Sequence, residues 1–177
     1  MSLSCENPLR LKNEVRLWIP APPERVWEFF SDFQRWPTWA EDCREVRRSA
    51  AGWYLVCRGE QGPDLRLAVR VTRLEPPHRL EFTPLEGARY DLEVSGWVAC
   101  EPHLQGTQVC LWVEAQASPQ ARRLQRHPEL WAGLLLEQSR GLLQDLRRAL
   151  LEPSPTEPIQ AEPLTKAARA LPVLVYY

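Results

Sequence analysis

Residues 15–39 read VRLWIPAPPERVWEFFSDFQRWPTW and join a strand pattern directly to a helix pattern. Every second residue from Val15 to Ile19 is aliphatic, which is the period of a strand with one buried face. The prolines that follow end this strand. Pro22 and Pro23 suit a helix start, because the first helical turn leaves the N–H that proline lacks without a partner anyway.

An aromatic stripe continues after the prolines. Val26, Phe29, Phe30 and Phe33 are spaced i, i+3, i+4, i+7, so a helix would carry them on one face. Together with Trp27, the first helical residues of this stripe are expected to be core, because amphipathic helices bury such faces.

A second short helix is expected immediately afterwards. Ser31 or Asp32 could cap it, and it would carry Phe33 and Trp36. Pro37 is expected to end this helix and to leave Trp39 in a turn.

Six strand candidates follow, separated by turn residues such as Ser49–Gly52, Gly59–Pro63 and the Pro76-Pro77 pair. Asp64–Leu74 alternates between aliphatic and polar residues, as in a sheet with one solvated face. The six candidates are Cys43–Arg48, Trp53–Arg58, Asp64–Leu74, Arg79–Thr83, Arg89–Cys100 and Thr107–Ala117.

The last two candidates form a hairpin whose register can be predicted, with its loop at Pro102–Gly106. Setting Val98 opposite Leu111 and Trp97 opposite Trp112 keeps apolar partners together, whereas a slip by one residue would not. The tryptophan pair would lie on the outer face, where it stabilises the hairpin or forms a partner surface.

The cysteines and histidines predict no metal site. The five cysteines include no C-x-x-C pair, and the three histidines lie far apart in the sequence. In the predicted hairpin Cys100 and Cys110 fall on opposite faces, which disfavours a disulfide between them. We therefore expect buried, reduced thiols.

A long helix is expected near the end of the chain. Ser118 and Pro119 resemble an N-cap and a first helical residue, and Pro128 predicts a break near His127. Beyond it, residues with helical spacing predict an amphipathic helix that ends near Leu151. The stripe consists of Trp131, Leu135, Ser139, Leu142, Leu146 and Leu150, widened by Leu134 and Leu143.

The length and charge of the chain limit its organisation and partners. A chain of 177 residues with net charge -1 predicts one domain, placed here at residues 1–152, and gives no reason to expect nucleic acid as a partner. No run of 18 apolar residues and no signal-peptide pattern is found, so we expect a cytoplasmic protein without stable membrane insertion. Residues 1–12 are expected to be a loose lead-in. The segment 153–177 is interpreted as a proline-rich linker with an apolar tail that docks on this domain or on a second copy in a homodimer, or is a stray end.

Three parts of the chain resemble the START-like (SRPBCC) superfamily, in its polyketide cyclase/dehydrase and lipid-transport branch, which includes birch-pollen-allergen-like proteins. Residues 19–39 are similar to its opening, Val71–Phe82 to its strand, double-proline turn and next strand, and Gly106–Val109 to the start of its last strand. The resemblance covers roughly residues 13–151. It implies an α+β helix-grip fold, a curved antiparallel sheet wrapped around a long C-terminal helix.

The resemblance also implies a cavity between helix and sheet that holds a hydrophobic small molecule without a cofactor. Phe33, Trp36 and Trp39 are expected at its entrance, although Trp36 and Trp39 could equally be core. The residues expected to line the cavity are Phe33, Trp36, Trp39, Leu67, Val69, Phe82, Tyr90, Leu92, Val94, Trp131 and Leu135.

Three functions are consistent with the sequence: a carrier or sensor of an apolar molecule, a cyclase/dehydratase using the same cavity, and an interaction module acting through its tail or the Trp97–Trp112 pair. The enzyme would need a positioned acid or base and a donor for oxyanion charge. Residues of suitable type are Tyr54, Arg66, His78, Glu81 and Tyr90, but no catalytic motif contains them. Arg66 is read more simply as part of a solvated face, and His78 as a surface turn residue.

Overall fold

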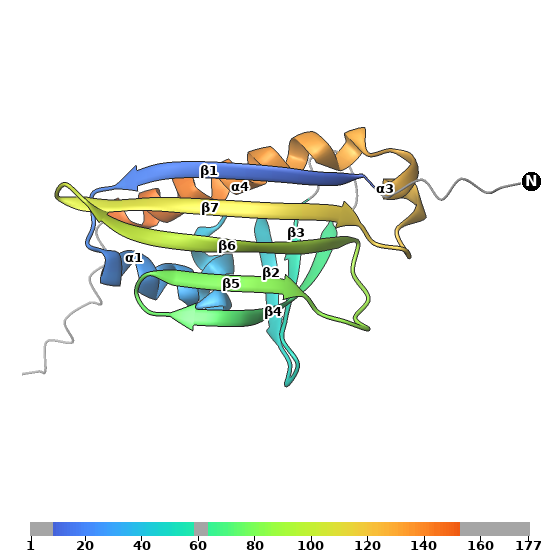
Figure 1. Ribbon diagram of the computed structural model, residues 1–177, viewed down its shortest axis with the longest axis horizontal. Helices are drawn as coiled ribbons and strands as arrows, with labels where there is room; N and C mark the ends of the chain where they lie inside the picture. The colour runs from blue at the N-terminus through green and yellow to red at the C-terminus, as the bar shows by residue number, and fades with distance from the viewer. Residues whose placement is uncertain (1–8, 59–63, 153–177) are drawn as a thin grey trace, which may run out of the picture.

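The structure is a computed structural model that describes residues 9–58 and 64–152. These residues form one seven-stranded sheet with the helices packed against it (Figure 1). The elements in chain order are β1 (Arg10–Ile19), α1 (Pro23–Ser31), the 3-10 helix η1 (Phe33–Arg35), α2 (Trp36–Trp39), β2 (Cys43–Arg48), β3 (Trp53–Cys57), β4 (Leu65–Glu75), β5 (Arg79–Pro84), β6 (Leu92–His103), β7 (Gly106–Ala117), α3 (Arg122–Arg126) and α4 (Glu129–Leu151).

The sheet is curved and its strands follow the order β1-β7-β6-β5-β4-β3-β2, with antiparallel pairing between neighbours. Figure 1 shows α4 running along β1 and β7, while β2 and β3 run across the direction of β5 and β6. Irregular pairing at Cys43/Glu45 in β2 and at Val71/Arg73 in β4 helps the sheet to bend, because a bulged strand bends and twists more strongly. The result is the helix-grip α+β fold that the sequence predicted.

The core lies between the concave face of the sheet and α4. Alternate residues of β6, from Leu92 to Cys100, are buried on this face, and the stripe of α4 buries Trp131, Leu143 and Leu146. Each such aliphatic or aromatic side chain stabilises the fold by roughly 1.5–3 kcal/mol when fully buried. The predicted stripe is therefore confirmed as the face that α4 turns towards the sheet.

The predicted register of the last hairpin is confirmed. Val98 lies opposite Leu111 and Trp97 opposite Trp112. Cys100 and Cys110 are free thiols on opposite faces of the sheet.

The loop of this hairpin is shorter than predicted. The strands run on to His103 and Gly106, so that only two residues connect them, and the first of these, Leu104, has a positive φ of 54°. The prediction was wrong because Pro102 was read as a turn residue, whereas it pairs with Thr107 in the ladder.

The N-terminal strand starts earlier than predicted. Residues 10–12 belong to β1 and pair with Ala115 and its neighbours in β7, so they are no loose lead-in. Asn13 is a polar residue on the half-buried face that Leu11 and Val15 share, and backbone pairing to β7 holds the strand despite this interruption of the apolar pattern.

The first helices also differ from the prediction at their ends. Neither Ser31 nor Asp32 caps η1 with its side chain. The Ser31 hydroxyl donates to the Trp27 carbonyl instead, at 2.8 Å. Pro37 does not end a helix but lies in the first turn of α2, where a missing N–H costs nothing, and Trp39 is the last residue of α2.

The start of the C-terminal helices was predicted too early. Ser118 is buried and its hydroxyl donates to the Tyr90 carbonyl at 2.7 Å, while α3 begins only at Arg122. The predicted break at His127 is confirmed, since α3 ends before it and α4 starts at Glu129. The predicted turn at 59–63, the lead-in before residue 9 and the tail 153–177 lie outside the described residues.

Candidate functional site

A cavity of about 130 Å³ lies between α4, the α1–α2 segment and the concave face of the sheet. Most of its wall is aliphatic or aromatic, and every strand except β1 contributes to it, as do α1, η1, α2 and α4. Polar side chains are few. They are Asp42, Gln138, Ser139 and Asp145.

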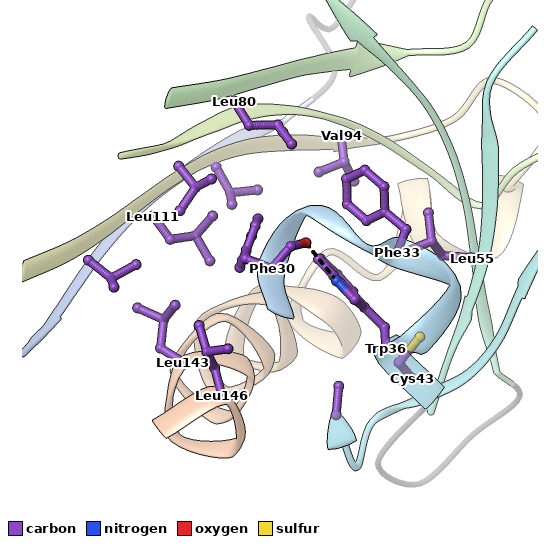
Figure 2. Packing of buried hydrophobic residues seen from close by; sticks show 14 of the residues in the cluster. Phe30, Phe33, Trp36, Cys43, Leu55, Leu80, Val94, Leu111, Leu143 and Leu146 are labelled. Carbon is purple, nitrogen blue, oxygen red and sulfur yellow. Dashed lines mark hydrogen bonds between the residues drawn. The ribbon is translucent and has the colours of Figure 1, made fainter. Parts of the chain in front are cut away.

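Aromatic rings of the α1–α2 segment form one side of the wall (Figure 2). The rings of Phe30 and Phe33 lie 5.2 Å and 5.0 Å from that of Trp36. Phe33 also contacts Trp53 of β3 at 5.3 Å. Such tilted ring pairs contribute about 0.5–1.5 kcal/mol each beyond the burial of their area, so this side of the wall is firmly held.

The opposite side of the wall is formed by the sheet. Phe82 of β5 is directed over Gly96 of β6, since a Cβ placed on Gly96 would come within 2.9 Å of Phe82 Cζ. The missing side chain at position 96 therefore leaves room for the Phe82 ring. Figure 2 shows Val94 of the same strand directed towards Phe33.

The polar side chains of the wall gather where α4 meets the α2–β2 loop. Gln138, Ser139 and Asp145 each form a hydrogen bond with the backbone. Gln138 donates through its amide nitrogen to the Arg58 carbonyl at 2.8 Å, and Ser139 donates to the Leu135 carbonyl at 2.7 Å.

Asp145 anchors this end of the cavity. Its carboxylate accepts the backbone N–H of Glu41 at 2.8 Å and also bonds to Arg148. Arg148 in turn contacts the Glu41 carboxylate at 2.7 Å, so three charged groups tie α4 to the loop before β2.

Two thiols also line the cavity. Burial raises the pKa of Cys43 to about 11 and that of Cys57 to about 12. Cys43 and Cys57 face each other across β2 and β3 as register partners. Because the thiolate is the nucleophile of cysteine, these protonated thiols are part of an apolar wall rather than reactive groups at neutral pH.

Most residues predicted from the sequence to line the cavity do so. Eight of the eleven belong to the wall: Phe33, Trp36, Leu67, Val69, Phe82, Leu92, Val94 and Leu135. Phe33 and Trp36 are buried in this wall, which favours the core interpretation of their rings over an exposed entrance.

Trp39, Tyr90 and Trp131 are not in the wall. Trp39 packs against Trp36 at 5.7 Å, and its indole nitrogen is buried without a hydrogen-bond partner among residues 9–58 and 64–152. Tyr90 lies in the loop before β6, because that strand starts at Leu92 rather than Arg89. Trp131 donates to the Leu124 carbonyl at 3.1 Å and so joins α4 to α3.

The side chains named as possible acids, bases or donors lie outside the cavity wall. Arg66 pairs with Asp91 at 3.2 Å on the outer face of the sheet. This agrees with the solvated face on which the sequence analysis placed it. Tyr54 precedes the wall residue Leu55 in the strand and thus has the opposite orientation. Glu81 pairs with arginines, which lower its pKa, and His78 is exposed in the turn after β4.

Sequence reasoning missed the polar end of the cavity. Gln138, Leu142 and Asp145 are spaced i, i+4, i+7 and form a second row beside the apolar stripe of α4. This spacing could have predicted from the sequence that they face the cavity. Asp42 had no such signal, because it belongs to a short connection.

Neither a metal cluster nor a membrane-spanning helix is found in the part of the chain that the structure describes. No three His, Cys, Asp or Glu side chains come together there in a metal-binding arrangement. No helix in these same ranges combines the length and the apolar character needed to cross a bilayer.

The sequence and the fold both match known proteins. The profile of a family described as polyketide cyclase / dehydrase and lipid transport matches residues 11–150. A comparison with curated proteins gave no match.

Similar solved structures include an aromatase/cyclase and two further proteins. The Zhui aromatase/cyclase from Streptomyces sp. R1128 has a TM-score of 0.64 at 15% identity, covering 80% of this chain and 94% of that one. The protein TTHA0849 from Thermus thermophilus has a TM-score of 0.63 at 22% identity, covering 81% and 97%. Ara h 8.0201 has a TM-score of 0.53 at 12% identity, covering 81% and 99%. At these identities the likeness concerns the fold alone.

Proposed function

Because the chain belongs to the polyketide cyclase/dehydrase and lipid transport family, we propose that it binds a hydrophobic small molecule, as a carrier or sensor, in the cavity between α4 and the sheet. The observation that carries the proposal is the cavity itself, whose wall is apolar except at one end. The ligand-binding unit would be residues 1–152, with 153–177 as an appended segment.

Leaving such a space empty is unfavourable. Protein interiors are packed to a density of roughly 0.75, and wall atoms that face a void lose their dispersion contacts on that side. Water gains little in such a space, because it needs polar partners on several sides. An apolar guest restores the dispersion contacts of the wall. Its own apolar surface is also removed from water, so dispersion and the hydrophobic effect both favour binding.

A titration tests this proposal directly. A graded series of apolar molecules, from toluene to a long-chain alcohol, is added while tryptophan fluorescence is followed, since Trp36 is part of the wall. We expect saturable binding of at least one member of the series. The proposal fails if none of them binds saturably.

A matched pair of variants shows whether binding occurs in this cavity. Val94→Phe places a ring into the space, whereas Val56→Phe makes the same change on the outer face of β3, between the wall residues Leu55 and Cys57. We expect Val94→Phe to weaken binding at least tenfold and Val56→Phe to leave it unchanged. Equal effects of both variants would place the ligand elsewhere.

A second candidate is a cyclase/dehydratase acting in the same cavity, and the polar end of the wall favours it. Asp42 is a carboxylate within reach of a guest. It could take a proton from a carbon between two carbonyls, so that this carbon attacks a ketone of the same molecule and closes a ring, and return the proton to the new alkoxide. A second proton, taken from the same carbon and passed to the hydroxyl, would then let it leave as water. Incubation with a poly-β-ketone analogue would then yield a cyclised product lacking one water, and Asp42→Asn would abolish its formation. Binding without such a product supports the carrier over the enzyme.

A further inference from the structure

The polar groups of the cavity wall carry no positive charge. No lysine, arginine or histidine is among the described residues that line the cavity, whereas two acidic residues, Asp42 and Asp145, are. The side chain of Arg148 is half-exposed and already engaged by Asp145 and Glu41. A ligand that brings a carboxylate or phosphate would therefore meet negative charge without a cation to offset it.

The polar end of the wall also offers more hydrogen-bond acceptors than free donors. The Ser139 hydroxyl hydrogen is directed to the Leu135 carbonyl, so its oxygen lone pairs remain available to accept. Gln138 donates one N–H of its amide to the Arg58 carbonyl, which leaves its other N–H as a donor and its carbonyl oxygen as an acceptor. Both side chains share the polar end of the wall with Asp42 and can accept a hydrogen bond from a ligand.

Asp42 differs from Asp145 in its partners. The oxygens of Asp145 bond to the Glu41 N–H and to Arg148, whereas no hydrogen bond to the Asp42 carboxylate is found among residues 9–58 and 64–152. Its carboxylate lies beside α4, because a Cβ on Gly141 would be 3.7 Å from Asp42 Oδ2. A half-buried carboxylate without a partner at the polar end of an apolar cavity is suited to receive a donor from a ligand.

The volume of the cavity favours a small ligand. Its volume of about 130 Å³ is close to that of an engineered apolar cavity, of about 150 Å³, that binds benzene. Phe30, Phe33, Trp36 and Phe82 supply aromatic faces and edges to a ring in that space.

We propose that the ligand is a single-ring aromatic alcohol or amine that enters the apolar cavity with its ring and donates a hydrogen bond from its polar group to Asp42. This inference rests on the proposed function, because it assumes that the cavity is the binding site. A donor held by a carboxylate in a site of low polarity forms a charge-assisted hydrogen bond, which is stronger than a neutral one.

Four probes of similar size test the inference: toluene, benzyl alcohol, benzylamine and benzoate, each titrated by calorimetry at neutral pH. We expect benzyl alcohol and benzylamine to bind more tightly than toluene, and benzoate to bind most weakly. Asp42→Asn should reduce the affinity for benzylamine by about tenfold, the usual effect of a hydrogen bond to a charged group, and leave toluene unchanged. Asp32→Asn, a change to an exposed carboxyl group in the connection after α1, should change none of the four affinities.

The outcomes separate the inference from the proposed function. Saturable binding of toluene together with equal affinities for benzylamine and benzoate would overturn the inference and leave the proposed function standing. An unchanged preference in Asp42→Asn would overturn it as well. If none of the four probes binds while a longer member of the apolar series does, the inference fails and the proposed function stands; the proposed function fails only if the whole series fails to bind.

Discussion

The indole N–H of Trp36 donates a 2.9 Å hydrogen bond to the backbone carbonyl of Phe30, and both residues line the cavity. The bond joins the end of α1 to the start of α2 and fixes the Trp36 ring against Phe30 and Phe33, as Figure 2 shows. The position of the Trp36 ring in the cavity wall therefore depends on a buried hydrogen bond.

Trp36→Phe should keep most of the ring contacts and lose this bond. The Phe30 carbonyl would be left without its indole donor in a buried site, which costs about 1–3 kcal/mol of the free energy of unfolding. Urea denaturation measures the change. Trp97→Phe, on the half-buried outer face, serves as control and should cost less, and equal losses in the two variants would argue against a role for the bond.

Asp145 should contribute more to stability than a surface acidic residue does. Asp145→Ala removes the acceptor of the Glu41 N–H and leaves Arg148 with one partner fewer, so we expect a loss of about 1–3 kcal/mol. Asp64→Ala, which breaks only an exposed pair with Arg44 at 3.3 Å, should cost at most about 1 kcal/mol. Denaturation curves that show the reverse order would contradict the anchoring role of Asp145.

The glycines of the sheet and of α4 should respond in opposite directions to alanine. Gly133 lies in α4 with nothing within 4 Å of the position that a Cβ would take, so Gly133→Ala should stabilise the protein by about 0.5–1 kcal/mol through higher helix propensity. In Gly96→Ala the new methyl group would collide with the Trp112 carbonyl and the Phe82 ring, and we expect destabilisation by about 1–3 kcal/mol. Thermal unfolding of the two variants measures both effects, and a shift of the same sign would be inconsistent with the packing described.

Alkaline pH should destabilise the fold through its buried thiols. Burial raises the pKa of Cys43 to about 11 and that of Cys100 to about 12, whereas an unfolded chain ionises cysteine near about 8.5. Above that value the unfolded state releases protons that the folded state retains, so stability is full below about pH 8.5 and falls as pH rises towards 11–12.

Denaturation between pH 8 and 10.5 measures this loss, which amounts to at most about 1.4 kcal/mol per pH unit for each thiol. In the double variant Cys43→Ala/Cys100→Ala the decline should be shallower, although the variant starts from a lower stability because both side chains are buried. A decline as steep as in the unchanged protein would show that other groups cause it.

The sequence predicted the parts of the fold that depend on local periodicity. Alternation along the strands and 3.6-residue spacing in α4 identify which side chains point inward, and pairing Trp97 with Trp112 fixes the register of the hairpin. These rules also identified most of the cavity wall, because a residue on the inner face of this sheet faces either the core or the cavity.

The parts that were wrong depend on contacts between distant residues. The local sequence predicts Ser118 as a helix cap, but its hydroxyl donates a hydrogen bond to the Tyr90 carbonyl, 28 residues away. At the polar end of the cavity, Asp145 accepts a hydrogen bond from Glu41, 104 residues earlier in the chain. No local pattern encodes such a pairing, so the chemistry of the site was less predictable than its shape.

The central claim is that the space between α4 and the sheet holds an apolar guest. A crystal structure of the protein soaked with toluene tests it most directly. We expect density for one ring bounded by Phe33, Val94 and Leu135, with the wall otherwise unchanged. A cavity that has collapsed onto itself, or toluene bound only on the outside of the protein, would contradict the claim.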